Sequence, residues 1–339
     1  MHASNAPALL LERVTKTFGD HVAVDDVSLT VPRGTVYGFI GPNGAGKTTT
    51  LRMIVDIIRP DAGTITVLGE HDLSKTRGRV GYLPEERGMY KKMRALEFVS
   101  YVGTLNGLTP SEARRRASDL MDRYDLGDWK DKSVDALSKG MQQKLQFITT
   151  IVHDPELMIL DEPFSGLDPV NIELMAEAVR ASRNSGHSVI FSTHMMEHAE
   201  RLCDAILMIH RGRKVLDGPI ADIKAAVRDR PIKLTAYGEA GFIATLPYVE
   251  RVRNFGSDHE VYLRAGTAPH ELLKDLVGRL QITRFEVAEA SLYDIFLEQV
   301  APGRAHRFAS DGSLIAAEDD PLARLKGQSG HVAAAEERT

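Results

Sequence analysis

The stretch Gly41-Pro42-Asn43-Gly44-Ala45-Gly46-Lys47-Thr48 decides how the rest of the chain is interpreted. It matches the pattern G-x-x-x-x-G-K-[ST], and it lies between a strand-like run, Val36 to Ile40, and a helix-like run, Thr49 to Ile58. Glycines let successive backbone N–H groups curl around phosphate oxygens, and the start of a helix adds positive potential. The order strand, loop and helix therefore predicts a nucleoside triphosphate site rather than an ordinary glycine-rich turn.

The side chains of this stretch suit a polyphosphate and its metal ion. Lys47 would reach the β and γ phosphates, and the hydroxyl of Thr48 would ligate magnesium. We therefore expect ATP and Mg²⁺ as cofactors. The residues predicted to contact the nucleotide here are Gly41, Pro42, Asn43, Gly44, Ala45, Gly46, Lys47, Thr48 and Thr49.

Two acids follow a second apolar, strand-like run. Leu157 to Leu160 come directly before Asp161 and Glu162. A carboxylate at the end of such a strand can hold magnesium, and a second one beside it can orient or deprotonate the attacking water. In isolation, a strand that ends in an exposed acidic turn explains the same residues equally well. The presence of Lys47 and Thr48 favours the catalytic interpretation.

The run Leu137-Ser138-Lys139-Gly140-Met141-Gln142-Gln143-Lys144 closely resembles the signature sequence of the ATP-binding cassette (ABC) family. Ser138 precedes a helical apolar pattern that continues to Val152, so a hydroxyl and the N–H groups of a helix start would face one direction. An ordinary serine-capped helix has the same local pattern. The position between the phosphate loop (residues 41–48) and the acidic strand end favours the signature, and the resemblance extends over Leu9 to Val227.

The resemblance implies roles for three further positions. Ser165-Gly166-Leu167-Asp168 is similar to the D-loop of the family, and His194 is similar to its switch histidine, which would contact the γ-phosphate and Glu162. Phe18 lies where the family usually places an aromatic residue that stacks on adenine, although core packing also suits such a ring. The residues that the resemblance assigns to ATP outside the phosphate loop are Phe18, Ser138, Gly140 and Asp168.

One position departs from the family pattern. After Val80-Gly81-Tyr82-Leu83-Pro84 the family normally has a glutamine that reaches the metal, and this chain has Glu85. A carboxylate can still ligate magnesium, but it adds negative charge near Asp161 and Glu162. The predicted metal ligands are Thr48, Glu85 and Asp161, and the predicted catalytic residues are Lys47, Glu162 and His194.

The sequence predicts an α/β fold with a phosphate-loop core of ABC type, a β-rich subdomain at its start and a helical subdomain. We expect the ATP-binding domain over residues 8–227, with the helical insert at about 86–155. A small C-terminal α+β domain is predicted over 228–300, with strands at Ile232 to Ala236, Glu260 to Leu263 and Ile282 to Val287. Residues 301–339 are rich in small and charged residues, which predicts a disordered tail.

Composition narrows the class of protein. The 339 residues carry a formal net charge of -5 without a long basic block, which argues against a dedicated nucleic-acid binder. The single cysteine, Cys203, cannot form an internal disulfide, and Met1 to Leu11 lack the features of a secretory signal, so a reducing cytoplasm fits best. No apolar run has the length of a membrane span, so we expect a membrane connection only through a partner.

The resemblance implies a transporter ATPase that works as a homodimer or a paired cassette on a separate integral-membrane permease, at the inner face of the cell membrane. The segments Glu86 to Met93 and Ser291 to Glu298 resemble export-type cassettes related to sodium or drug extrusion. Two alternatives stay open at this point. One is a soluble ABC machine acting on nucleic acid or in translation, and the other is a nucleotide-dependent regulator whose C-terminal domain binds a protein.

Overall fold

The computed structural model describes residues 6–86, 88–226, 231–264, 266–288, 291–300, 307–308 and 314–315. The chain divides into two compact units, Met1–Ala226 and Val227–Thr339. The domain limits expected from the sequence, 8–227 and 228–300, remain predictions and are not taken from this division. The predicted disordered tail, residues 301–339, lies almost entirely outside the described residues, which include only the short strands β14 (Arg307–Phe308) and β15 (Leu314–Ile315) there.

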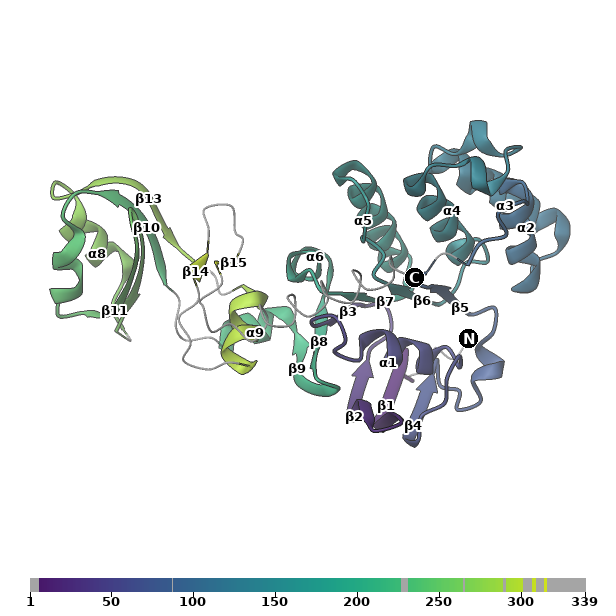
Figure 1. Ribbon diagram of the computed structural model, residues 1–339, viewed down its shortest axis with the longest axis horizontal. Helices are drawn as coiled ribbons and strands as arrows, with labels where there is room; N and C mark the ends of the chain where they lie inside the picture. Colours follow the sequence, from purple (N-terminus) through teal and green to yellow (C-terminus); the bar gives the residue numbers. More distant parts are fainter. Residues whose placement is uncertain are drawn as a thin grey trace, which may run out of the picture. The chain divides into compact units, whose positions relative to one another are not determined.

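The first unit alternates strands and helices along the chain (Figure 1). Its strands are β1 (Leu9–Phe18), β2 (His21–Val31), β3 (Val36–Ile40), β4 (Ala62–Val67), β5 (Val80–Leu83), β6 (Leu157–Asp161), β7 (Ser188–Thr193), β8 (Ala205–His210) and β9 (Arg213–Pro219). Its helices are α1 (Lys47–Ile54), α2 (Ala95–Leu105), α3 (Pro110–Arg123), α4 (Lys139–Ile151), α5 (Pro169–Asn184), α6 (Met196–Leu202) and α7 (Ile220–Ala226). Short 3-10 helices lie at Leu73–Thr76, Gly127–Trp129 and Val134–Ala136.

A six-stranded sheet in the order β5-β6-β7-β3-β8-β9 forms the centre of this unit. The pairs from β5 to β8 are parallel, and β9 adds an antiparallel edge. A second sheet, in the order β2-β1-β4, is antiparallel. Because parallel strands end at the same edge, the loops after β5, β6, β7 and β3 emerge side by side.

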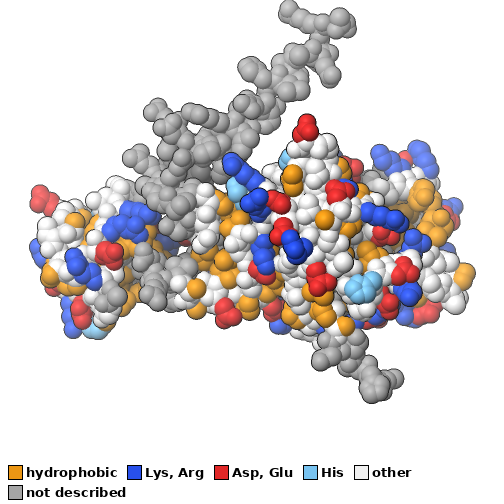
Figure 2. Space-filling view, turned by 90° about the horizontal axis from the view of Figure 1, so that it is seen from below, with side chains coloured by type: hydrophobic (Ala, Val, Ile, Leu, Met, Phe, Trp, Pro, Cys, Tyr) orange, Lys and Arg blue, Asp and Glu red, His pale blue; other side chains and the backbone are white. Residues whose placement is uncertain are grey.

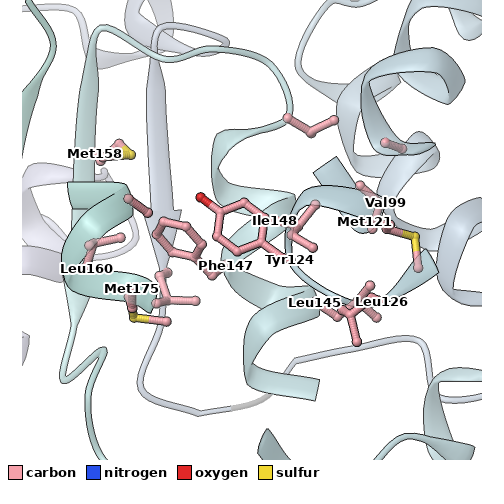
Figure 3. Close-up of a cluster of buried hydrophobic side chains, with 14 of the residues drawn as sticks. Val99, Met121, Tyr124, Leu126, Leu145, Phe147, Ile148, Met158, Leu160 and Met175 are labelled. Carbon is pink, nitrogen blue, oxygen red and sulfur yellow. The ribbon is translucent and has the colours of Figure 1, made fainter. Parts of the chain in front are cut away.

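Side chains alternate between two hydrophobic cores on opposite faces of the central sheet. Met158 and Leu160 of β6 face the core built with α2 to α5, whereas Leu157 and Ile159 face the core built with α1 and the antiparallel sheet. Figure 1 shows α2 to α5 on one side of the central strands, and α1 and the antiparallel sheet on the other. In Figure 3, the β6 residues lie beside Phe147 and Ile148 of α4, so the helical part is packed directly onto the strand that carries the acids.

The helix starts follow local side-chain chemistry. The Ser138 hydroxyl accepts a hydrogen bond from the N–H of Met141 at the start of α4, and the Asp168 carboxylate accepts one from the N–H of Asn171 at the start of α5. The helix predicted for Thr49 to Ile58 is wrong in its bounds, since α1 ends at Ile54. Asp56 has a φ of 58°, and a left-handed residue just after a helix terminates it.

The second unit is an antiparallel sheet with helices. Its sheet has the order β11-β12-β10-β13, formed by β10 (Ile232–Tyr237), β11 (Val249–Phe255), β12 (Asp258–Leu263) and β13 (Gln281–Val287). Its helices are α8 (Pro269–Leu276), α9 (Leu292–Val300) and the 3-10 helix Ala240–Thr245. Leu234, Val261, Leu272 and Leu276 pack in one core, so α8 covers one face of the sheet. The strand β11 was not predicted from the sequence.

Candidate functional site

The predicted phosphate and acid residues meet at the carboxyl edge of the central sheet. Leu83 of β5 pairs with Leu160 of β6, Asp161 pairs with Ser192 of β7, and β7 pairs with β3 up to Ile40. The phosphate loop follows β3, Glu162 follows β6 and His194 follows β7. Sequence segments far apart are therefore placed on adjacent strands.

The backbone of the phosphate loop explains two of its glycines. Gly41 has a φ of 153° and Gly46 a φ of 108°, both in the region that favours glycine. A Cβ atom at Gly41 would lie 2.2 Å from the carbonyl oxygen of Ile209, and one at Gly46 would lie 2.4 Å from that of Ala23. No side chain fits at either position. The turn after β8 further supports the loop, because the N–H of Gly212 donates to the carbonyl oxygen of Ala45 over 2.9 Å.

Lys47 begins α1 and is folded back over the loop. Its ammonium donates to the carbonyl oxygens of Gly41 and Pro42 over 2.8 and 3.3 Å. The same nitrogen lies 3.4 Å from Oε1 of Glu162, with exposed fractions of 5% for Lys47 and 9% for Glu162. The cation and the carboxylate are thus a buried ion pair that joins the phosphate loop to the acidic strand end.

Asp161 is held in place by hydroxyl groups from two directions. Its Oδ1 accepts hydrogen bonds from Thr48 Oγ1 over 3.1 Å and from Ser192 Oγ over 2.6 Å. Burial raises the pKa of Asp161, and Glu162 raises it further, while the two hydroxyl groups lower it. Within the described residues, Asp161 Oδ2 is buried and has no hydrogen-bond partner.

Ser192 is a site residue that was not predicted from the sequence. Besides donating to Asp161, its oxygen accepts the backbone N–H of Glu162 over 2.9 Å, and the side chain is fully buried. It thereby fixes both acids at once. The available signal was a hydroxyl directly after the apolar residues Val189 to Phe191 of β7, but a buried serine alone does not indicate which strand lies beside it.

Glu162 has an unusual backbone and a second partner. Its φ of 48° is left-handed, a conformation that is uncommon for residues other than glycine and is often found at functional sites. Its Oε2 lies 3.1 Å from Nδ1 of His194. Lys47, Glu162 and His194 therefore form a continuous chain of contacts, with Thr48 and Asp161 beside it.

Other predicted residues lie away from this chain of contacts. Ser138 is exposed at the start of α4, and Asp168 is exposed at the start of α5. A Cβ atom at Gly140 would lie 3.7 Å from Nδ2 of Asn171, so the starts of α4 and α5 are neighbours. Phe18 ends β1 with half of its surface exposed, which disagrees with a purely core-packing role.

Glu85 is exposed directly after β5 and Pro84. Gln146 of α4 donates to the carbonyl oxygens of Pro84 and Glu86 over 3.4 Å each, so it holds the backbone on both sides of Glu85. Gln143 of the same helix donates to the carbonyl oxygen of Pro163 over 2.9 Å. These contacts of Gln143 and Gln146 were not predicted from the sequence, and they connect α4 to the loops that follow β5 and β6. Among the described residues, no three His, Cys, Asp or Glu side chains are grouped to hold a metal ion.

A parallel sheet whose carboxyl edge brings together a phosphate loop, two acids and a histidine defines a phosphate-loop ATPase with a helical insert. The sequence model of the ABC transporter family matches residues 24–165, and that of the ATP-binding protein DrrA1-3-like, C-terminal domain, matches residues 218–300.

Known proteins resemble most of the chain. The uncharacterized ABC transporter ATP-binding protein YhaQ of Bacillus subtilis (strain 168) is 39% identical over 292 residues, covering 86% of this chain and 98% of that protein. The Nod factor export ATP-binding protein I of Sinorhizobium fredii (strain NBRC 101917 / NGR234) is 35% identical over 295 residues, covering 86% of this chain and 85% of that protein. A solved structure of an ATP binding subunit of an ABC transporter has a TM-score of 0.61 and 30% identity, covering 64% of this chain and 92% of that one.

The chain belongs to the ABC transporter ATP-binding proteins, and it is an ATP-binding ATPase. The family resemblance and the fold class predicted from the sequence are confirmed. Within the described residues, no helix combines the length and the apolar character needed to cross a membrane.

Proposed function

We propose that this chain couples ATP hydrolysis to a separate membrane permease that exports its substrate, and that it works as a homodimer at the inner face of the cell membrane. The contact chain from Lys47 through Glu162 to His194 at one edge of the sheet supports ATP hydrolysis, and the match to the ABC transporter family supports the coupling to a permease. Export is supported by the extended similarity to a Nod factor export protein.

In this proposal Glu162 is the general base. Its carboxylate is buried, fixed by Lys47 and His194, and placed by the Ser192 contact to its own backbone N–H. A fixed carboxylate at this edge can accept a proton from a water molecule that attacks the γ-phosphate. Lys47 would leave the Gly41 carbonyl oxygen for the β and γ phosphates, where its charge offsets theirs.

The contact between His194 and an ionised Glu162 would assign one tautomer to the histidine. A carboxylate oxygen only accepts hydrogen bonds, so Nδ1 of His194 must carry the hydrogen that it shares with Glu162. A neutral ring then has no hydrogen on Nε2. If Nε2 donates to the γ-phosphate as well, the ring has to be doubly protonated, and the positive charge would lie between the carboxylate and the phosphate.

The oxygen atoms beside the phosphate loop fit magnesium. Thr48 Oγ1 and Asp161 contact each other, and Asp161 Oδ2 is a buried acceptor without a hydrogen-bond partner in the described residues. Hard oxygen ligands of this kind, completed by phosphate oxygens and water, are typical of Mg²⁺ sites. Thr48 and Asp161 would hold the ion, which would neutralise charge on the phosphates. Glu85, on the neighbouring loop, stays a predicted additional ligand.

Glu85→Gln is expected to preserve hydrolysis and to raise the Mg²⁺ concentration needed for half-maximal rate by up to about tenfold. The substitution exchanges an anionic oxygen for a neutral amide beside the proposed metal site. A magnesium titration of ATP hydrolysis measures the effect. Glu86→Gln removes the same charge from the adjacent exposed residue and serves as the matched control. Identical titrations for wild type and Glu85→Gln would place Glu85 away from the metal.

A second copy of the chain would complete the ATP site. Ser138 caps the start of α4, where its hydroxyl and the first N–H groups of the helix form an exposed anion-binding end beside Gly140. In an isologous dimer, this end of one subunit faces the phosphate loop of the other, so two equivalent ATP molecules lie between the subunits. Asp168, exposed at the neighbouring start of α5, would lie at the same interface.

The permease would dock beside the Glu85 loop. Tyr90, Tyr101 and Leu105 are 60%, 42% and 67% exposed, and the Tyr90 ring contacts the rings of Phe98 and Tyr101 edge to face with centroids 6.1 Å apart. Exposed aromatic and aliphatic side chains grouped in this way are typical of protein interfaces. Because Gln146 holds the Glu85 loop to α4, movement at this surface would reach the edge that carries the acids.

We expect the chain to copurify with a membrane permease from detergent-solubilised membranes of the native cells. The double variant Tyr90→Ser, Tyr101→Ser should lose roughly tenfold or more of this copurification, because aromatic residues dominate binding at interfaces. Tyr237→Ser removes a ring that is 55% exposed in the second unit and serves as the control. Retention of the permease by the double variant would place docking elsewhere, and a chain found only in the soluble fraction after crosslinking would contradict the transporter proposal.

The charge pattern of one face and the net charge of the chain are the reasons to propose a partner other than nucleic acid. Figure 2 shows Lys and Arg side chains interspersed with Asp and Glu side chains on the face that it presents. The net charge of the chain is -5. A nucleic-acid interface would need a clustered basic surface that offsets phosphate charge.

A further inference from the structure

The exposed ring of Phe18 has a cation beside it. Lys16 Nζ lies over the Phe18 ring, 5.4 Å from the ring centroid, a distance at which a cation and a ring face attract each other. Phe18 is half exposed, whereas only 16% of the Lys16 side chain is exposed. The ring therefore has one face toward Lys16 and still presents a large surface to solvent.

Asp61 fixes Lys16 and the end of β1 together. Its Oδ1 accepts a hydrogen bond from Lys16 Nζ over 2.8 Å, and its Oδ2 accepts the backbone N–H of Thr17 over 2.7 Å. The N–H of Asp61 in turn donates to the carbonyl oxygen of Thr15 over 2.8 Å. The hydrogen bonds from Lys16 and Thr17 lower the pKa of Asp61, so the carboxylate stays charged at neutral pH. Asp61 thus forms hydrogen bonds with Thr15, Lys16 and Thr17, the three residues before Phe18.

The segment that contains Asp61 follows the helix that begins with Lys47. Asp61 lies between α1, which begins with Lys47, and β4, which pairs with β1. The aspartate therefore joins the strand end that carries Phe18 to the segment that follows the phosphate-binding helix.

We propose that Lys16, held by Asp61, is a positioning residue that orients the Phe18 ring for stacking on the base of ATP. The proposal rests on the proposed role of Phe18 as the surface on which the base stacks. A fixed cation on one face restricts the ring to an orientation in which its free surface receives the base, so less side-chain freedom is lost on binding. Lys16 then acts on the affinity for the base and leaves the contacts of the phosphates unchanged.

The test compares two probes on the full-length protein: ATP, which has a base, and inorganic tripolyphosphate, which has none. Lys16→Met keeps the aliphatic stem and removes the charge, so the Kd for ATP should rise roughly two- to fivefold, as expected for the loss of a weak cation–π contact. Asp61→Asn should act in the same direction because it releases Lys16. The Kd for tripolyphosphate should stay unchanged in both variants, which also shows that the phosphate site is folded.

Two further variants show whether a change in the Kd for ATP comes from the Phe18 ring or from the loss of a positive charge. Arg13→Met removes a cation from the same strand, one that is 82% exposed and paired with Asp26, and it should leave the Kd for ATP unchanged. Phe18→Ala should weaken ATP binding, and adding Lys16→Met to it should cause no further loss if Lys16 acts through the ring.

The outcomes distinguish this inference from the proposed function. If Phe18→Ala weakens ATP binding but Lys16→Met does not, the positioning role of Lys16 is wrong and stacking on Phe18 stands. Equal losses for ATP and tripolyphosphate in Lys16→Met would show a general charge effect and would also overturn the inference. If Phe18→Ala leaves the Kd for ATP unchanged, the assignment of Phe18 to the base fails, and the role of Lys16 fails with it.

Discussion

Glu162→Gln is expected to lower the rate of ATP hydrolysis by roughly 10²-fold or more while ATP still binds, because removing a general base costs about this factor. The amide has nearly the shape of the carboxylate, but it does not accept a proton from water. Glu162 is 9% exposed, so solvent does not easily replace it as a base. With hydrolysis slowed, ATP contacts that bridge Lys47 and the facing Ser138 should persist, and the closed homodimer should accumulate.

Analytical ultracentrifugation of Glu162→Gln with and without magnesium and ATP measures this association. Glu177→Gln makes the same chemical change at an exposed position of α5 and should hydrolyse ATP like the wild type. A Ser138→Arg change in the Glu162→Gln background should abolish the dimer, because a bulky side chain would occupy the exposed end of α4 that faces the phosphates. A Glu162→Gln protein that hydrolyses ATP normally, or that stays monomeric at saturating ATP, would leave the facing-dimer mechanism without support.

The sequence predicted much of the fold because local patterns were strong. The continuous apolar run Leu157 to Leu160 became β6, and the glycine loop between strand and helix lies where its motif requires. The strand β11 was missed because Val249–Phe255 carries two arginines and a glutamate between its apolar residues. This segment forms a strand because it pairs with β12, and that pairing cannot be predicted from the local sequence.

The candidate site was predicted residue by residue but not as an arrangement. Lys47, Glu162 and His194 were each identified from a motif or from the resemblance, and their mutual contacts follow from the order of parallel strands. Parallel neighbours are connected by long crossovers, so this order is not a local property of the chain. For the same reason Ser192 and Gln146 could not be assigned, since their partners lie on strands or loops that are distant in sequence.

Lys47→Ala is expected to raise the Kd for ATP roughly 10- to 100-fold, the range that corresponds to losing a hydrogen bond to a charged group. The lysine also has a structural role, because its removal leaves the Glu162 carboxylate at a buried position without the cation that lies 3.4 Å away. An uncompensated buried charge destabilises a fold, so a loss of ATP binding by Lys47→Ala alone would have two explanations.

The double variant Lys47→Ala, Glu162→Gln separates these explanations. It removes both charges of the buried pair, so thermal stability should return toward the wild-type value while the Kd for ATP stays high. Thermal unfolding of the nucleotide-free proteins gives the first quantity and equilibrium ATP titration the second. Recovery of ATP affinity in the double variant would show that Lys47 acts by neutralising Glu162 rather than by contacting phosphate. Unchanged ATP affinity and turnover in a folded Lys47→Ala protein would likewise contradict the assignment of Lys47 to the β and γ phosphates.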